Sequence, residues 1–159
     1  MTTAPPTNSA TEGEEISLND AATHVLEECR TVVPGMQALF GFQLIAVFST
    51  VFREQLSSTE RVLHLAAILL VTVAIVLVIA PAAVHRHMDP LVVSRRFITI
   101  SSALLMASMA PLAAGICLDV YIVGRVILGG SAGAALIAGL TLLVFIVFWL
   151  VVPRMARRP

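Results

Sequence analysis

Four long stretches of this chain carry no charged side chain: residues 31–52, 65–84, 97–118 and 126–152. All ten basic residues, each of them Arg, and all ten acidic residues lie outside these stretches. A helix rises about 1.5 Å per residue and the hydrocarbon core of a bilayer is about 30 Å thick, so about 20 apolar residues cross it. Each stretch is long enough. The pattern predicts an all-α polytopic membrane protein with four transmembrane helices.

Composition agrees with this prediction. Hydrophobic residues make up 58% of the chain and charged residues 13%, whereas soluble proteins have about 25% charged residues. A soluble helix needs a polar stripe, but Thr72 is the one polar side chain in residues 65–84. A soluble bundle is therefore the weaker alternative. With a net charge of zero and no large basic patch, nucleic acid is not expected as a partner; the lipid bilayer is.

The N-terminal part differs from the rest. Residues 1–15 have almost nothing to bury and predict a disordered cytoplasmic tail. Residues 16–33 predict an amphipathic interfacial helix with Ser17 as its N-cap. Pro34-Gly35 is expected to break this helix and to begin the membrane domain. Residues 1–31 lack the basic start and apolar core of a cleavable signal peptide, so the first span is expected to serve as its own targeting signal.

The four-helix transmembrane domain is expected over residues 34–153. Its spans lie at about 34–52, 62–84, 97–118 and 130–152, and a basic cytoplasmic tail follows at 154–159. Ser57 and Glu60 have the spacing of a capping box at a helix start. Asp89-Pro90 predicts another start, with Asp as N-cap and Pro at the first helical position. Pro153 is expected to end the last span.

The distribution of Arg predicts the orientation, because cytoplasmic loops are enriched in Arg and Lys. In this topology seven Arg flank the side that holds both termini: Arg30, Arg86, Arg95, Arg96, Arg154, Arg157 and Arg158. Three flank the other side: Arg53, Arg61 and Arg125. Both termini are therefore predicted to be cytoplasmic. The absence of Lys resembles proteins encoded by GC-rich bacterial genomes, which indicates a bacterial plasma membrane. Cys29 and Cys117 would lie at opposite membrane faces, so no disulfide is expected.

Polar residues in or beside the spans are the candidate functional positions. Gln37 and Gln43 lie on different faces of the first span; they could line a polar path, but hydrogen bonds between packed helices are favoured. Asp119 and Arg125 bracket the short third connection. They could pair there or hold an ion, but contact of each charge with water is favoured.

No metal, cofactor or catalytic site is predicted. His85 and His87 are two residues apart and do not share a helix face, and His64 is expected near the other membrane surface. Contact of His85 and Arg86 with lipid phosphates is favoured instead. No His–carboxylate arrangement is visible near a buried hydroxyl, so the chain is not expected to be an enzyme.

Small residues mark one stretch as a helix-packing candidate. Gly129 and Gly133 form a GxxxG motif, and such residues let helix backbones approach closely. The contact could lie within the chain or at a homodimer interface.

Three segments carry a family resemblance: Glu-Cys-Arg at 28–30, Pro-Gly-Met-Gln-Ala-Leu-Phe-Gly-Phe at 34–42, and Ile-Ala-Pro-Ala-Ala-Val-His-Arg at 79–86. With them the chain resembles, over about residues 20–152, an uncharacterised family of small four-span bacterial integral membrane proteins. Some members are labelled sodium:proton antiporters. The resemblance marks the following positions without assigning chemistry to them: Glu28, Arg30, Pro34, Gln37, Pro81, His85, Arg86 and Asp119.

The leading hypothesis for function is a structural or accessory subunit, as a homo-oligomer or in a larger membrane assembly. A proton-coupled exchanger usually needs a carboxylate inside the membrane, and the four uncharged stretches contain none. The alternative is a sodium:proton antiporter or small-solute carrier that acts as an oligomer, with Asp119, Arg125 and Gln37 along its path. A membrane-bound enzyme comes third.

Overall fold

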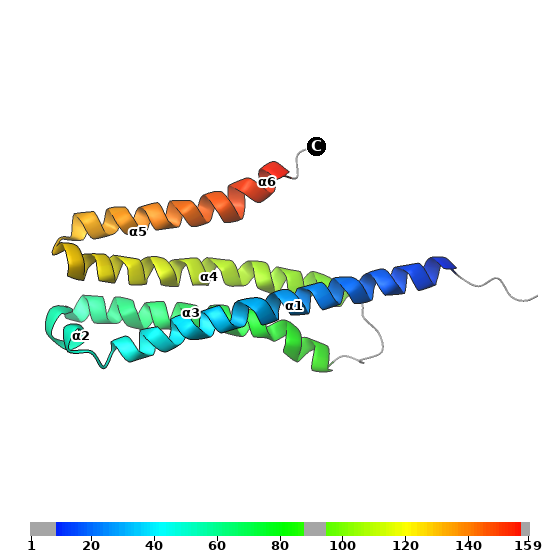
Figure 1. Ribbon diagram of the computed structural model, residues 1–159, viewed down its shortest axis with the longest axis horizontal. Helices are drawn as coiled ribbons and strands as arrows, with labels where there is room; N and C mark the ends of the chain where they lie inside the picture. Colours follow the sequence, from blue (N-terminus) through cyan, green and yellow to red (C-terminus); the bar gives the residue numbers. More distant parts are fainter. Residues whose placement is uncertain (1–8, 88–94, 157–159) are drawn as a thin grey trace, which may run out of the picture.

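A computed structural model describes residues 9–87 and 95–156, and this part of the chain contains helices and no strand. The long helices run in alternating directions (Figure 1). In chain order the helices are α1 (Ser9–Ala46), α2 (Thr50–Gln55), α3 (Ser58–His87), α4 (Arg95–Leu128), α5 (Ser131–Ile146), a π-helical turn (Val147–Val151) and α6 (Val152–Ala156).

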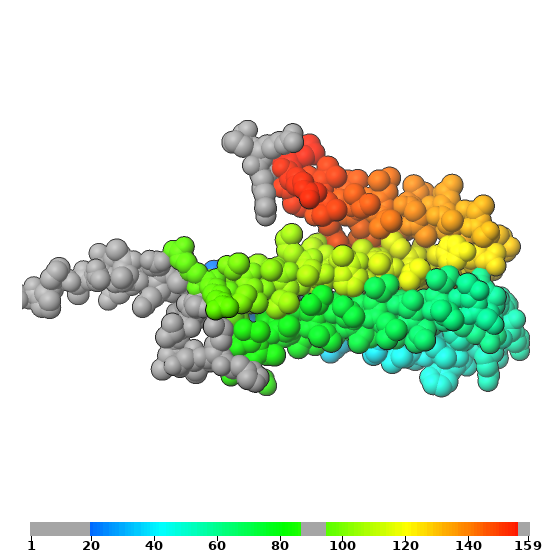
Figure 2. All heavy atoms as spheres, turned by 180° about the vertical axis from the view of Figure 1, so that it is seen from behind, coloured from blue at the N-terminus to red at the C-terminus, as the bar shows by residue number. Residues whose placement is uncertain are grey.

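Helix α4 lies at the centre of the arrangement, between α3 and α5 (Figures 1 and 2). Helix α1 crosses α3 and α4 obliquely on one face of the molecule, and the view from behind shows α3, α4 and α5 side by side on the other face. The short helix α2 and the turn between α4 and α5 lie at one end of the bundle. We call this the α2 end. The beginning of α1 and the end of α6 both lie toward the opposite end.

Three segments are long and apolar enough to cross a membrane: Ser58–Arg86, Arg95–Leu128 and Ser131–Met155. They contain the predicted spans 62–84 and 97–118 and all but the first residue of 130–152. The predicted first span, 34–52, is not among them, because α1 ends at Ala46 and a turn leads to α2. The described residues therefore give three candidate spans where the sequence predicted four.

Helix α1 is continuous through Pro34, so the predicted break between an interfacial helix and a first span is wrong. Its buried residues recur every seven positions, at Ala22, Cys29, Met36 and Gln43. A seven-residue repeat keeps one stripe of a helix against its neighbours over many turns. Pro34 lies on the exposed side of α1, away from this stripe, so packing holds the helix together on both sides of the proline.

Other predicted boundaries also shift. Residues 9–15 belong to α1, so the predicted disordered tail is wrong for them, and Ser17 lies inside the helix rather than at its start. Pro153 does not end the last helix: α5, the π-helical turn and α6 follow one another without a break, and Pro153 is the second residue of α6. Residues 1–8, the predicted helix start at Asp89-Pro90 and residues 157–159 lie outside the described residues.

Helices α3 and α4 pack closely because small side chains line their contact. The buried residues of α3 recur at alternating intervals of four and three: Glu60, His64, Ala67, Val71, Ala74, Val78 and Pro81. Facing them, α4 buries Ser101, Ser108 and Gly115. A Cβ atom on Gly115 would lie 2.9 Å from Val71 Cγ2 and 3.2 Å from the backbone oxygen of Ala67. Only glycine fits there without movement of a helix.

The two glycines of the predicted GxxxG packing motif differ in position: Gly129 forms the turn after α4, and Gly133 lies at the start of α5. Gly129 has a φ of 66° and ends α4, its N–H donating to the Arg125 carbonyl, as glycine often does after a helix. A Cβ on Gly129 would meet nothing within 4 Å, so Gly129 makes no close contact within the described part of the chain. A contact at a homodimer interface stays a prediction. A Cβ on Gly133 would meet Leu128 Cδ1 at 2.9 Å, across the same turn. The close α4–α5 contact lies at Gly124, whose added Cβ would be 3.2 Å from Ala134 Cα.

Candidate functional site

Three polar side chains from three helices meet near the α2 end. Gln43 Nε2 of α1 donates a hydrogen bond to Asp119 Oδ2 of α4 at 2.6 Å. His64 of α3 places Nδ1 3.4 Å from the other carboxylate oxygen, Asp119 Oδ1. Gln43 and His64 are buried, and the Asp119 side chain is 20% exposed. We call Gln43, His64 and Asp119 the polar triad.

The ends of the helices explain how the polar triad is held. Gln43 lies in the last turn of α1, where backbone carbonyls lack partners within the helix. His64 Nε2 lies 2.9 Å from the Gln43 carbonyl oxygen and supplies that partner. The ring of Phe52, from α2, packs edge-to-face on His64 with centroids 5.2 Å apart. The imidazole is therefore fixed from both sides.

The geometry gives His64 two oxygen neighbours. The Gln43 carbonyl oxygen accepts only, so His64 Nε2 donates to it. The other ring nitrogen, Nδ1, lies 3.4 Å from Asp119 Oδ1.

One atom of the polar triad has no partner. Gln43 Oε1 is one of two buried side-chain polar atoms of the described residues without a hydrogen bond, the other being Ser101 Oγ. A buried, unpaired acceptor costs about 1–3 kcal/mol. The polar triad borders a groove of about 360 Å³ between the end of α1, α2, α3 and α4.

A second group of polar contacts lies at the α2 end. Ser57 and Glu60 form the predicted capping box: Glu60 Oε2 accepts from the Ser57 N–H at 2.8 Å, and Ser57 Oγ accepts from the Glu60 N–H at 3.3 Å. Arg125 Nε, in the last turn of α4, donates to Glu60 Oε1 at 2.8 Å. An acidic residue at a helix start and a basic residue at a helix end both suit the helix dipoles. This contact joins α3 to α4.

The predicted relation between Asp119 and Arg125 is therefore wrong. Helix α4 continues to Leu128, so both residues lie inside it rather than around a connection. They do not pair with each other: Asp119 bonds Gln43, and Arg125 bonds Glu60. The sequence argument ended the span at the first charge, whereas burial against partners from α1 and α3 lets the helix continue.

The other candidate residues lie elsewhere. Gln37 is exposed on α1, on a different face from Gln43 as predicted. Arg30, His85 and Arg86 line a groove of about 440 Å³ between α1 and α3, away from the α2 end. Glu28 borders a third groove beside α4. Within the described residues no group of three His, Cys, Asp or Glu side chains could hold a metal ion, and both cysteines are free.

Sequence reasoning missed two residues of this end, His64 and Glu60. His64 was expected near a membrane surface without a role, and Glu60 only as a cap. A signal was present: both continue the four-three spacing of the apolar residues on α3. Gln43 likewise continues the seven-residue spacing on α1. A polar residue in register with a buried stripe is expected to point toward neighbouring helices.

One comparison with known proteins gives a match. The family of unknown function DUF6328 matches residues 11–153, which is most of the chain. No curated protein and no solved structure matches. The chain therefore belongs to the DUF6328 family, whose function is unknown.

Proposed function

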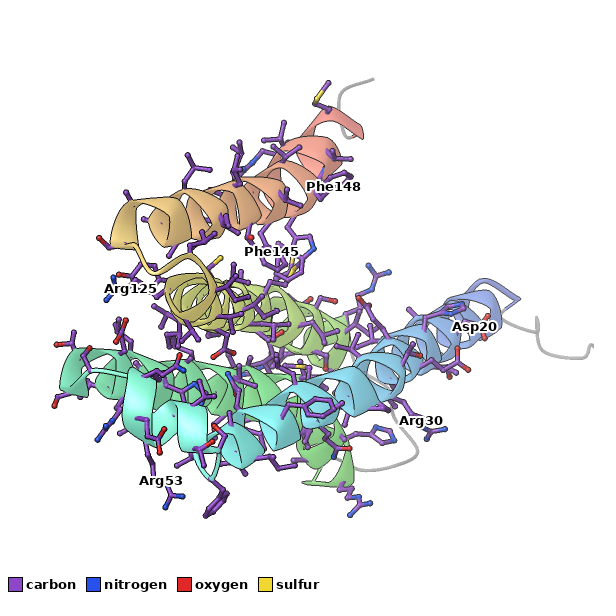
Figure 3. All side chains as sticks on the ribbon, turned by 60° about the vertical axis from the view of Figure 1, so that its left-hand side comes forward. Asp20, Arg30, Arg53, Arg125, Phe145 and Phe148 are labelled. Atoms are coloured by element: carbon purple, nitrogen blue, oxygen red, sulfur yellow. The ribbon has the colours of Figure 1, made fainter. Side chains whose placement is uncertain are left out.

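We propose that this chain is an integral membrane protein of the bacterial plasma membrane with a structural or accessory role. Its apolar surface supports membrane insertion: Ala134 is the one buried residue described in α5, and large side chains such as Leu136 and Phe148 are exposed. The labelled charged residues lie toward the two ends of the molecule, Arg53 and Arg125 at one and Asp20 and Arg30 at the other (Figure 3). Lipid would cover the apolar middle.

The accessory role rests on one observation, the projection of α1. This helix has 38 residues and is about 57 Å long, more than the hydrocarbon core needs. It extends past the ends of α3 and α4 (Figure 1). Asp20, Glu27 and Glu28 are exposed on it. A charged helical arm continuous with a membrane bundle suits contact with a partner protein outside the bilayer, in a larger assembly or a homo-oligomer.

Site-specific photo-cross-linking in membranes tests the accessory role. A photoreactive amino acid at Asp20, toward the projecting end of α1 (Figure 3), is expected to capture one protein at a fixed stoichiometry. The matched control is Leu136, which is 63% exposed on apolar α5 and is expected to capture lipid. If Asp20 gives no protein adduct, or many adducts without fixed stoichiometry, the accessory proposal is wrong.

A second candidate function, cation–proton exchange, is favoured by the polar triad. Asp119 in the polar triad is a partly exposed carboxylate, and a carboxylate can hold a proton and a cation in turn. His64 comes directly before the uncharged stretch 65–84, and Asp119 comes directly after the stretch 97–118. The polar triad therefore lies at one edge of the uncharged region, where water and ions can approach.

Proteoliposomes with an enclosed pH-sensitive dye test the exchanger. Sodium-dependent proton movement that is lost in Asp119→Asn and kept in Glu54→Gln would support exchange and displace the accessory role as the main function. Glu54 is the matched control because it is an exposed carboxylate on α2, at the same end. Absence of proton movement in the unmodified protein would exclude sodium–proton exchange.

A further inference from the structure

A groove between α1 and α3, at the end of the bundle opposite α2, combines cationic and apolar side chains. Arg30 of α1 lines it together with His85 and Arg86 of α3. Its volume is about 440 Å³, within the range of about 300–1,000 Å³ that is usual for ligand pockets. We call it the basic groove. No member of the polar triad is among the described residues that line it, so it is a separate site.

Arg30 and Arg86 give the basic groove a positive charge that a ligand can reach. Both side chains are exposed, and Arg is always charged in proteins. The described residues that line the groove include no Asp or Glu. The acidic residues just before Arg30 in sequence have other neighbours: Glu28 borders the groove beside α4, and Glu27 Oε2 lies 3.9 Å from His24 Nδ1. The basic groove therefore favours an anionic ligand.

The polar side chains of the basic groove suit a phosphate group. A guanidinium presents its N–H groups in a planar fork that matches phosphate oxygens. Arg30 and Arg86 belong to different helices and so approach the groove from two sides. The half-buried ring of His85 packs against Phe97 of α4, with centroids 5.5 Å apart, which holds a further nitrogen-bearing side chain in place. Together these residues can surround a tetrahedral phosphate.

The polarity of the basic groove changes along its length. Helices α1 and α3 are antiparallel (Figure 1), so Leu26 and Arg86 lie at the outer end, and Pro34 and Ile79 lie toward the middle of the bundle. At about 1.5 Å per residue, the groove extends about 12 Å along α1 and about 10 Å along α3. Arg30 lies midway on α1, and the inner part of the wall is apolar. This gradient matches an amphiphile whose headgroup lies outside and whose chain points inward.

The basic groove also lies where lipid headgroups are expected. Arg86 is the last residue of one candidate span, and Arg95 is the first residue of the next. Ile79 is 43% exposed, so the inner end of the groove opens onto the surface that lipid would cover. The beginning of α1 and the end of α6 lie toward this end, which the distribution of Arg predicts to be cytoplasmic. The cytoplasmic leaflet is the one with a negative surface potential from anionic lipids.

We propose that the basic groove binds one anionic phospholipid of the cytoplasmic leaflet, whose phosphate accepts hydrogen bonds from Arg30 and Arg86 while the first part of an acyl chain lies against Val33 and Ile79. This site goes beyond the accessory role, but it rests on the proposed membrane insertion. Carbonate extraction of membranes separates the two. A chain that stays in the membrane pellet and does not select an anionic lipid would contradict the site alone.

Two related ligands fit less well. Phosphatidylethanolamine has the same phosphate, but its ammonium group would lie near two guanidinium groups, with no carboxylate among the described residues of the wall to bond it. A soluble phosphate ester has the charge but no apolar part to cover Val33 and Ile79. The basic groove thus favours a phospholipid with net negative charge.

Native mass spectrometry of the delipidated full chain in detergent tests this selection. The probes are dioleoylphosphatidylglycerol, dioleoylphosphatidylethanolamine and glycerol 3-phosphate. The phosphatidylglycerol is expected to give a saturable adduct of one lipid and to bind about fivefold more tightly than the phosphatidylethanolamine, or better, since each Arg near an anionic headgroup contributes about that factor. Equal binding of the two lipids would overturn the proposal. Binding of glycerol 3-phosphate as tight as that of the phosphatidylglycerol would also overturn it, in favour of a soluble phosphate ester.

Charge variants locate the bound lipid. Arg30→Gln and Arg86→Gln are each expected to weaken binding of the phosphatidylglycerol about fivefold. Arg96→Gln is the matched control at the same end, because Arg96 is exposed at the start of α4 and is not among the residues that line the basic groove. Arg53→Gln is the control at the α2 end (Figure 3). Both controls should keep the affinity. An equal loss in Arg96→Gln would mean attraction by general surface charge and would overturn the site, as would unchanged affinity in Arg30→Gln and Arg86→Gln.

A variant that keeps every charge tests the groove itself. Ala82 is exposed and lines the basic groove, so Ala82→Phe would fill part of its space and should weaken binding of the phosphatidylglycerol about fivefold or more. Ala83→Phe is the matched control, since Ala83 is exposed in the next position and does not line the groove. Helix content and gel-filtration volume establish that each variant is folded. Unchanged affinity in folded Ala82→Phe would place the lipid outside the groove and overturn the proposal. If Arg86→Gln does not fold, Arg30→Gln on the other helix still decides the question.

Discussion

Single residues at the α2 end satisfy the polar groups that helix ends leave open. Ser57 and Glu60 cap the first turn of α3, and Arg125 bonds Glu60 from the last turn of α4. Arg61 donates to the backbone oxygens of Leu56 and Arg53, which holds the link between α2 and α3. These contacts have a structural role, whereas Gln43 Oε1 is buried without a hydrogen bond.

Replacement of Ser57 tests the capping box. Ser57→Ala removes the hydroxyl that accepts from the Glu60 N–H and is expected to lower the free energy of unfolding by about 1 kcal/mol. Denaturant unfolding in detergent, followed by circular dichroism, measures this change. Ser58→Ala is the matched control because Ser58 is exposed in the next position. If both variants lose the same stability, the cap does not have the expected role.

The pKa of the Cys29 thiol depends on its burial and on a neighbouring charge. Burial raises the pKa of Cys29, and the negative charge of the adjacent Glu28 raises it further. A raised thiol pKa means that the reactive thiolate forms only at higher pH. Alkylation of Cys29 is therefore expected to show a pH midpoint above that of an ordinary cysteine.

Alkylation rates measured against pH in a Cys117→Ala background test this expectation. Glu28→Gln removes one cause of the raised pKa, so the midpoint should move to lower pH. Glu27→Gln is the control, since this carboxylate lies 3.9 Å from His24 Nδ1, and should leave the midpoint in place. A midpoint that does not move in Glu28→Gln would show that the neighbouring charge has no effect.

Neighbouring helices in this bundle approach each other closely at glycines, which have no side chain. Gly115 allows α4 to approach α3, and Gly124 allows it to approach Ala134 on α5. Neither glycine belongs to the GxxxG motif, whose Gly129 forms the turn after α4 and whose Gly133 lies at the start of α5. Glycine spacing alone does not distinguish a turn from a helix contact, because both need a residue without a side chain.

A larger side chain at Gly115 is expected to separate α3 from α4. Gly115→Leu would place its Cβ against Val71 and the Ala67 backbone and should cost about 1–3 kcal/mol of stability through overpacking. Thermal unfolding in detergent measures this loss. Gly139→Leu is the control, because a Cβ there meets nothing within 4 Å. Similar stability of the two variants would contradict the close α3–α4 contact.

At the scale of the whole molecule, the number of membrane crossings depends on whether α1 crosses the membrane or lies at its surface. Three segments qualify as spans by length and composition, and α1 lies across α3 and α4 along the same bundle (Figure 1). If α1 crosses with them, both termini lie on one side of the membrane. The greater number of Arg on that side predicts that it is cytoplasmic.

Accessibility of single cysteines to a membrane-impermeant reagent measures this topology. In a background of Cys29→Ala and Cys117→Ala, cysteines added at both termini are expected to be protected in intact cells, whereas Glu54→Cys on α2 is expected to react. Termini on opposite sides would show three crossings and would place α1 at the membrane surface.

The sequence by itself determined the helical class, the three later spans and the capping box at Ser57. Each depends on local information: absence of charge over about 20 residues, or a hydrogen bond between residues three apart. The extent of α1 could not be predicted, because its continuity through Pro34 depends on packing of Ala22, Cys29, Met36 and Gln43 against other helices.

Only the tertiary structure decided the partners of the polar residues. Gln43 and Asp119 are 76 positions apart in sequence, and Glu60 and Arg125 are 65 apart. No local rule relates residues at such separations. Asp119 and Arg125, which marked ends of uncharged stretches, lie inside α4, because packing against α1 and α3 brings each of them to a partner. The positions of the charges set the limits of the apolar stretches, and helix packing determined which partners the charged side chains bond.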